Sequence, residues 1–275
     1  MDSQWIGRFS ALVASAVLVT SVCAQGTEKI VLDGSTGVMP LASALAKDFQ
    51  AKNLGITFEF GKGLGTKARF RALADGRIDV ALASHGLRVD ELTKQGMVVH
   101  EIARIAVVFG VNETVPVSHL TAQQVCDIYS GKVANWKPLG GPDLEIAVRT
   151  RPESEVDAEV VREGIACLKD LKMAESVKAM PKSGDMAKEL AAVPGAIGMT
   201  SMTVVEQSKG RIKATSLDGI AASADNVRGK SYTLIRKSYF VTQGSPSAAV
   251  ARFIEFTGSA SGADTIAANG AVPAK

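Results

Sequence analysis

The chain has 275 residues, of which 46% are hydrophobic, 5% aromatic and 21% charged, and its formal net charge is +3. This length can fill packed cores for one large domain or two smaller ones. So small a positive excess, with no basic run interleaved with aromatic residues, argues against a nucleic-acid-binding protein.

The N-terminal segment has the layout of a secretory signal peptide. Arg8 precedes an uncharged run from Phe9 to Ala24, and residues 22–24 form a Val-x-Ala exit. A membrane anchor needs about 20 apolar residues, and this run is shorter. We therefore expect residues 1–24 to be removed on export. The alternatives are a buried helix and a lipid anchor at Cys23; Val22 argues against the anchor because it is bulkier than that processing usually accepts.

Export would place the remaining cysteines in an oxidising compartment. Without Cys23 an even pair remains, Cys126 and Cys167. In an oxidising compartment such a pair favours a disulfide over two separate buried thiols. Metal binding is not expected, because there is no CxxC or HxxxH spacing and the histidines are scattered. The histidines are His85, His100 and His119.

Strand and helix patterns alternate through the first half of the mature chain. We expect strands at residues 29–34, 55–61, 78–84 and 101–112, and helices at 38–49, 66–77 and 88–96. In the first helix Leu41, Leu45 and Phe49 recur at helical spacing, and Pro40 is tolerated in the first turn. This order predicts βαβ units and a mostly parallel sheet.

The second half repeats the alternation. A helix is expected from Thr121 to Gly131, a strand at 144–151 and a helix at 155–171. Residues 182–202 then read as a capped helix, a Pro-Gly turn and a strand. Residues 229–243 are rich in β-forming residues, and 245–270 supply C-terminal helices. There is no internal repeat, and no long linker separates independent domains.

Small and hydroxylated residues gather where expected strands give way to helices. The first such turn contains Gly34, Ser35, Thr36 and Gly37. In an open α/β sheet these turns lie at the edge where ligands bind, and a helix N-terminus attracts anions. Glycines allow close backbone approach, while hydroxyls add donors. For any single turn, the alternative is a helix cap with nothing bound.

Three later junctions have a related composition. Their candidate ligand-binding residues are Gly65, Thr66 and Lys67 in the second turn, Ser84 and His85 in the third, and Arg151 and Ser154 in the fourth. Hydroxyl and guanidinium groups around one crevice form a cage for a tetrahedral oxyanion, because arginine offers paired donors. The recurrence of such turns therefore predicts an anion site.

With these motifs the sequence resembles the periplasmic phosphate-binding proteins of ABC transporters, within the wider type II periplasmic binding-protein family. The resemblance spans nearly all of the mature chain. It is carried by DGSTGVMPLASALAKDFQ (33–50), ALADGRIDVALAS (72–84) and LTAQQVCDIYSGKVANWKPLGGPDLEIAVRTRPES (120–154). The segments that follow keep the family's order to the C-terminus.

The resemblance implies an α/β protein of two lobes, with mixed sheets flanked by helices and the ligand in the interlobe cleft. Lobe one would comprise residues 27–109 plus 233–275, and lobe two residues 110–232. Residues 103–112 and 232–241 would be the crossing strands. Cys126 and Cys167 both fall in lobe two, where some relatives carry a disulfide.

The implied function is capture of phosphate or a similar small oxyanion for an ABC transporter permease, by a monomer in the periplasm that uses no cofactor. An enzyme is disfavoured because no nucleophile with an oriented base and no metal cluster is evident. The alternatives are a binding protein for another anionic solute, such as an organophosphate, phosphonate or carboxylate, and a sensor or scaffold with the same fold.

Two departures from the family pattern concern the second and third turns. Lys67 and Arg69 replace glycines of the family's Gly-Ser-Gly-x-Gly loop. Either the backbone there no longer approaches the ligand, or these cations contact it instead. His85 stands where the phosphate-specific members carry an acid that accepts phosphate's proton. It can donate or accept through its tautomers, or it is an ordinary surface residue at a strand end.

The third departure follows the binding arginine. Where the family has Ser-Gly-Thr, this chain has Ser154, Glu155 and Val156. A carboxylate beside an anion cage repels the anion unless it is protonated, paired or turned to solvent. Glu155 is therefore a solvated residue of the first helical turn, a partner of Arg151, or the acceptor for phosphate's proton.

Overall fold

The computed structural model describes Met1 and residues 27–84 and 86–274. Most of the expected signal peptide (2–24), including Cys23, lies outside the described residues, and so does His85. Within the described part, no helix combines the length and the apolar character needed to cross a membrane.

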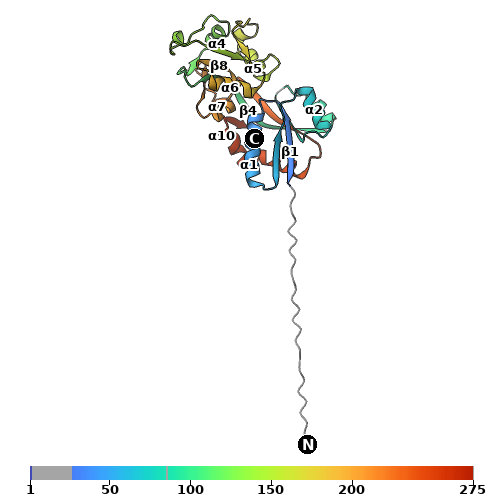
Figure 1. The fold of residues 1–275 in the computed structure, drawn as a ribbon. Helices are drawn as coiled ribbons and strands as arrows, with labels where there is room; N and C mark the ends of the chain where they lie inside the picture. Colours follow the sequence, from blue (N-terminus) through green and yellow to red (C-terminus); the bar gives the residue numbers. More distant parts are fainter. Residues whose placement is uncertain (2–26, 85, 275) are drawn as a thin grey trace.

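Two lobes are visible in Figure 1, one with α1, α2 and β1 and the other with α4, α5 and β8. The first contains β1 (Glu28–Gly34), α1 (Met39–Lys52), β2 (Ile56–Phe60), α2 (Thr66–Ala74), β3 (Val80–Ser84), α3 (Val89–Lys94), α9 (Ala248–Thr257), α10 (Ala260–Ala268) and β12 (Ala271–Pro273). We call it lobe one. Lobe one is thus built from two separate segments, one from the N-terminal part of the chain and one from the C-terminal part.

Lobe two is built from the middle of the chain. Its helices are α4 (Ala122–Tyr129), α5 (Val156–Gly164), α6 (Ser183–Ala192), α7 (Met202–Gln207) and α8 (Ala224–Arg228), with 3-10 turns η1 (Lys137–Leu139) and η2 (Ala166–Leu168). Its strands are β5 (His119–Leu120), β6 (Ala147–Thr150), β7 (Lys178–Ala179), β8 (Ala196–Ser201), β9 (Ile212–Ala214) and β10 (Ser216–Leu217).

One strand runs through both lobes. β4 (Met97–Asn112) pairs with β11 (Ile235–Gln243) along residues 97–106 and with β8 and β9 along 107–112. The strand order is β2-β1-β3-β11-β4-β8-β6-β7. β1, β2 and β3 are parallel, as are β6, β7 and β8, whereas β4 and β11 run antiparallel to their neighbours. The sheet is therefore mixed, as the resemblance implied, whereas the mostly parallel sheet expected from the strand–helix alternation alone was wrong.

The helical periodicity of the first helix places one face in the core. Leu41, Leu45 and Phe49 of α1 are buried as expected, and Phe49 packs edge-on against Phe58 and Phe253. Burial of such side chains is worth about 1.5–3 kcal/mol each. Because Phe253 comes from α9, this packing joins the two ends of the chain in lobe one and anchors the C-terminal part of α1.

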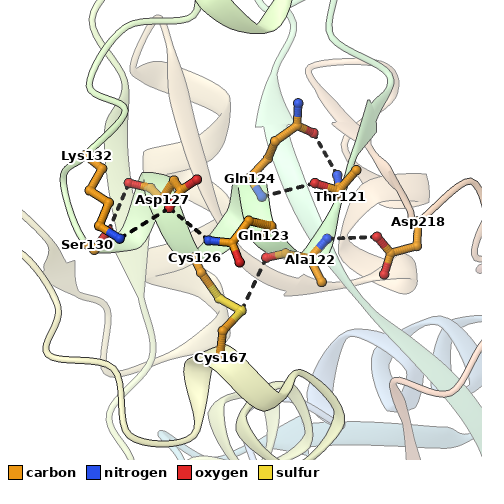
Figure 2. Close-up of a disulfide and its surroundings, with 10 residues drawn as sticks. All are labelled: Thr121, Ala122, Gln123, Gln124, Cys126, Asp127, Ser130, Lys132, Cys167 and Asp218. Carbon is orange, nitrogen blue, oxygen red and sulfur yellow. Dashed lines mark hydrogen bonds and ion pairs between the residues drawn. A yellow bond between two sulfur atoms is a disulfide. The ribbon is translucent and has the colours of Figure 1, made fainter.

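The helix expected at residues 155–171 is shorter than predicted. α5 ends at Gly164, and Ile165 is extended, with φ −120° and ψ 103°, before the short turn η2. The break places Cys167 on η2, opposite Cys126 on α4. The expected Cys126–Cys167 disulfide is confirmed, with the two Cα atoms 6.2 Å apart, and Figure 2 shows it beside the Thr121–Gln124 capping box that begins α4.

Candidate functional site

The glycine turn after β1 is shaped by close packing. Gly34 has φ +137°, and a Cβ there would lie 2.2 Å from the carbonyl oxygen of Leu82 on β3. The next residue, Ser35, donates its N–H to that same oxygen at 2.8 Å. Only glycine combines this left-handed backbone with so close a contact. The turn is thereby held against the carboxyl end of β3.

Gly37 leaves room for an arginine from the other end of the chain. A Cβ at Gly37 would lie 2.0 Å from Nη1 of Arg236, and Nη2 of Arg236 donates to the Gly37 carbonyl at 2.6 Å. Arg236 lies on β11 and is only 1% exposed. The glycine turn thus fixes a buried guanidinium group at the N-terminal end of α1.

A second arginine reaches the same region from lobe two. Arg151 follows β6; its side chain is 1% exposed, and its Nη2 lies 2.8 Å from Glu155 Oε2. Asp157, also buried, lies between the arginines, with carboxylate oxygens 4.0 Å from Arg151 Nε and 3.3 Å from Arg236 Nε. Asp157 therefore links the crossing strand to lobe two electrostatically.

Arg69 adds a third buried guanidinium group, from α2 of lobe one. It donates to the Leu82 carbonyl at 2.7 Å and to Thr66 Oγ1 at 2.6 Å. Burial lowers the pKa of Arg69, and the negative charge of Glu155 opposes this shift. Because Glu155 belongs to lobe two, Arg69 acts across the junction. We call Arg69, Arg151, Arg236, Glu155 and Asp157 the arginine cluster.

Hydrogen bonds beside the cluster close the two lobes on each other. The N–H of Ser183, the first residue of α6, donates to Thr36 Oγ1 at 3.4 Å. Lys182 Nζ donates to the Lys62 carbonyl at 2.8 Å. The first glycine turn therefore meets the N-terminus of α6 at the interlobe junction.

Buried polar atoms that lack a hydrogen-bond partner among the described residues gather at this junction. They are Arg69 Nε, Arg151 Nε, Arg236 Nε, Asp157 Oδ1, Ser183 Oγ and Ser238 Oγ; Thr203 Oγ1 is a further one. The Arg236–Asp157 pair lies within ion-pair distance but is not aligned for a hydrogen bond. Each buried donor without a partner costs about 1–3 kcal/mol, so the arginine Nε atoms and the Ser183 hydroxyl make this junction the candidate anion site.

The described residues among those predicted for the site fall into three groups. Gly34, Ser35, Thr36, Gly37 and Arg151 lie at the junction described above. Ser84 is buried beside it, but its hydroxyl donates to the Lys237 carbonyl at 2.9 Å. Gly65, Thr66, Lys67 and Ser154 are exposed, and of these Thr66 reaches the cluster through Arg69.

Sequence reasoning missed Arg236, Asp157 and Ser183 as site residues. A signal existed for Arg236. Every second residue from 232 to 240 is buried, so the arginine occupies an inward-facing position of the strand. No comparable pattern marks Asp157 or Ser183. Among the described residues, no group of three or more His, Cys, Asp or Glu side chains is placed to hold a metal ion.

Comparisons with known proteins agree with this architecture. The family model for the PBP superfamily domain matches residues 21–261. The phosphate-binding protein PstS of Bacillus subtilis is 26% identical over 239 residues, covering 85% of this chain and 77% of its own. PstS of Borreliella burgdorferi is 24% identical, with 90% of each chain covered.

Solved structures show the same fold. A protein of Clostridium perfringens, assigned as a phosphate ABC transporter substrate-binding protein and solved with bound phosphate, superimposes with a TM-score of 0.72 at 28% identity. The match covers 90% of this chain and 100% of that one. A phosphate transport receptor of Vibrio cholerae gives a TM-score of 0.59 at 24% identity, covering 88% and 99%. These matches confirm the predicted two-lobed α/β fold.

Proposed function

The chain belongs to the PBP superfamily, and on that premise we propose that it captures inorganic phosphate between its lobes and delivers it to an ABC transporter permease. It does so as a monomer in the periplasm, after removal of residues 1–24, and performs no chemistry on its ligand. Relatives named as phosphate-binding proteins support the choice of ligand, as does the related structure with bound phosphate. The observation that carries the proposal is the set of three buried arginines with unpartnered Nε atoms.

The lobes that close are residues 27–109 plus 233–275 and residues 110–232. Arg69 and Arg236 come from the first and Arg151 from the second, so an anion held by all three joins the lobes. Charge-assisted hydrogen bonds of this kind are about twice as strong as neutral ones. Thr36 and Ser183 add donors from the two facing loops.

The carboxylates select the protonation state of the ligand. Phosphate retains a proton at neutral pH and can donate it to Asp157 Oδ1, which lacks a hydrogen-bond partner in the described part of the chain. Sulfate has no proton and meets only repulsion from Asp157. The carboxylate of Glu155 forms an ion pair with Arg151 Nη2. When an anion binds to Arg151 instead, this carboxylate turns toward solvent. Phosphate is therefore preferred to sulfate.

Isothermal titration of the mature protein, freed of ligand by unfolding and refolding, tests the proposal. We expect phosphate to bind and sulfate to bind far more weakly. Arg151→Met should weaken phosphate binding by at least about tenfold, because a charge-assisted hydrogen bond is worth about 1.5–3 kcal/mol. Arg149→Met is the matched control: Arg149 is buried on β6, just before Arg151 in the sequence, but pairs with Glu189 at 2.8 Å. Absence of phosphate binding, or equal losses in both variants, would contradict the proposal.

A further inference from the structure

A groove between the lobes lies against the first glycine turn, whose Gly37 carbonyl accepts a hydrogen bond from Arg236. It has a volume of about 970 Å³ and runs between α1 on one side and α6 and α7 on the other. Thr36 and Ser183, which meet at the interlobe junction, are among the residues that line it. Small-molecule sites generally measure about 300–1,000 Å³. This space is far larger than a single inorganic phosphate requires.

Within the described part of the chain, the hydroxyl of Ser183 is a free hydrogen-bonding group on the wall of the groove. The residue is only 5% exposed, lines the groove, and its Oγ has no hydrogen-bond partner among the described residues. A buried hydroxyl without a partner is costly. A ligand oxygen that enters between Thr36 and Ser183 would remove that cost and bridge the groove to the arginine cluster.

The walls of the groove combine positive charge with apolar surface. Its cationic residues are Lys47, Lys62, Lys182, Lys188 and Arg211, against the single acid Asp185. Between them lie apolar side chains, including Met39, Ala44, Phe60, Ala187 and Ala191. Basic rims attract anionic ligands and raise their local concentration. The apolar floor in turn favours a ligand with hydrocarbon or ring surface.

We propose that the protein also binds organic phosphomonoesters, with the phosphoryl group at the arginine cluster and the organic group in the groove between α1 and α6. The inference rests on the proposed function, because it uses the same phosphate position. The lysines then contact further anionic or hydroxyl groups of the ester. The groove, rather than the arginine cluster, decides which esters bind well.

Titration of the mature protein with inorganic phosphate, phenyl phosphate and adenosine 5′-monophosphate tests this inference. The titration is run at about pH 5.5, where phosphomonoesters, whose second pKa is near 6, still carry the proton that Asp157 accepts. Burial of the apolar group should make at least one ester bind about tenfold more tightly than inorganic phosphate. Ala44→Trp fills the groove from α1 and should remove this gain while leaving inorganic phosphate binding within about twofold. Ala51→Trp is the matched control, on an exposed position of the same helix outside the groove.

The outcomes separate the two proposals. If inorganic phosphate binds but neither ester binds more tightly, or if Ala44→Trp leaves the gain intact, the groove assignment is wrong and the proposed function stands. If an ester binds and inorganic phosphate does not, the groove assignment stands and the choice of inorganic phosphate is wrong. If none of the three binds, both are overturned.

Discussion

Gly37→Ala should destabilise the protein and weaken phosphate binding, because it displaces Arg236, a residue 199 positions away in the sequence. The added Cβ would lie 2.0 Å from Nη1 of Arg236, whereas ordinary contacts begin near 3.4 Å. The guanidinium must therefore move by about 1.4 Å. It is held by the Gly37 carbonyl at 2.6 Å and lies 3.3 Å from Asp157, so the movement strains both contacts. Gly37 is not among the glycines with positive φ, which removes backbone strain as a cause.

We expect the free energy of unfolding to fall by about 2–3 kcal/mol, within the range for overpacking and for loss of a charge-assisted hydrogen bond. Phosphate binding should weaken at least about tenfold, since Arg236 leaves its position. Urea denaturation, followed by the fluorescence of the buried Trp136, gives the first quantity, and titration calorimetry the second. Gly65→Ala is the control, because nothing lies within 4 Å of its added Cβ. Equal effects of the two substitutions would refute this reasoning.

Three further predictions concern selectivity and stability. Asp157→Asn should reduce the preference for phosphate over sulfate at least about tenfold in competition titrations; an unchanged ratio would show that another group accepts the proton. Replacing Cys126 and Cys167 by Ser should cost about 4 kcal/mol in urea denaturation, because the bridge closes a loop between residues 41 apart; a reductant should affect only the parent protein, and an unchanged midpoint in the double variant would contradict this. The hydrogen bond from Thr265 is the main cause that lowers the pKa of Asp48 below 3.8. Asp48 thus stabilises the protein above that pH, and this contribution is lost as the pH falls through the lowered value. Asp48→Asn should therefore destabilise the protein more at pH 7 than in strong acid, and equal losses at both would contradict the linkage.

Local patterns were sufficient to predict the alternation of strands and helices, the strand-end turns and the disulfide, whereas the division into two lobes was implied by the family resemblance. The spacing of Leu41, Leu45 and Phe49 marked the buried face of α1, and the even cysteine pair indicated the bridge. These features depend on residues close in sequence or on the cellular compartment. The mixed sheet, in which β4 and β11 run antiparallel to their neighbours, followed from the resemblance and not from the local patterns, which favoured a mostly parallel sheet.

The candidate site was less predictable because its key contacts are distant in sequence. Gly37 was interpreted as a place where the backbone approaches the ligand, whereas it makes room for Arg236. Ser183 contacts Thr36 although the two are 147 positions apart in the sequence, and no local pattern predicts such a contact. Arg69 could be noticed as a replaced glycine, but its burial against the Leu82 carbonyl depends on how α2 packs on β3.

The position of β11 bears on how the chain would fold after the export proposed above. β11 lies between β3 and β4 in the sheet, yet it is made more than a hundred residues after either. Until residues 235–243 emerge, the facing edges of β3 and β4 in lobe one lack their shared partner. Open strand edges are templates for association with other chains, and late pairing of distant strands is slow. A chain that crosses a membrane N-terminus first should therefore depend on chaperones until its last 41 residues arrive, and C-terminal truncations before residue 235 should aggregate rather than leave a folded lobe one.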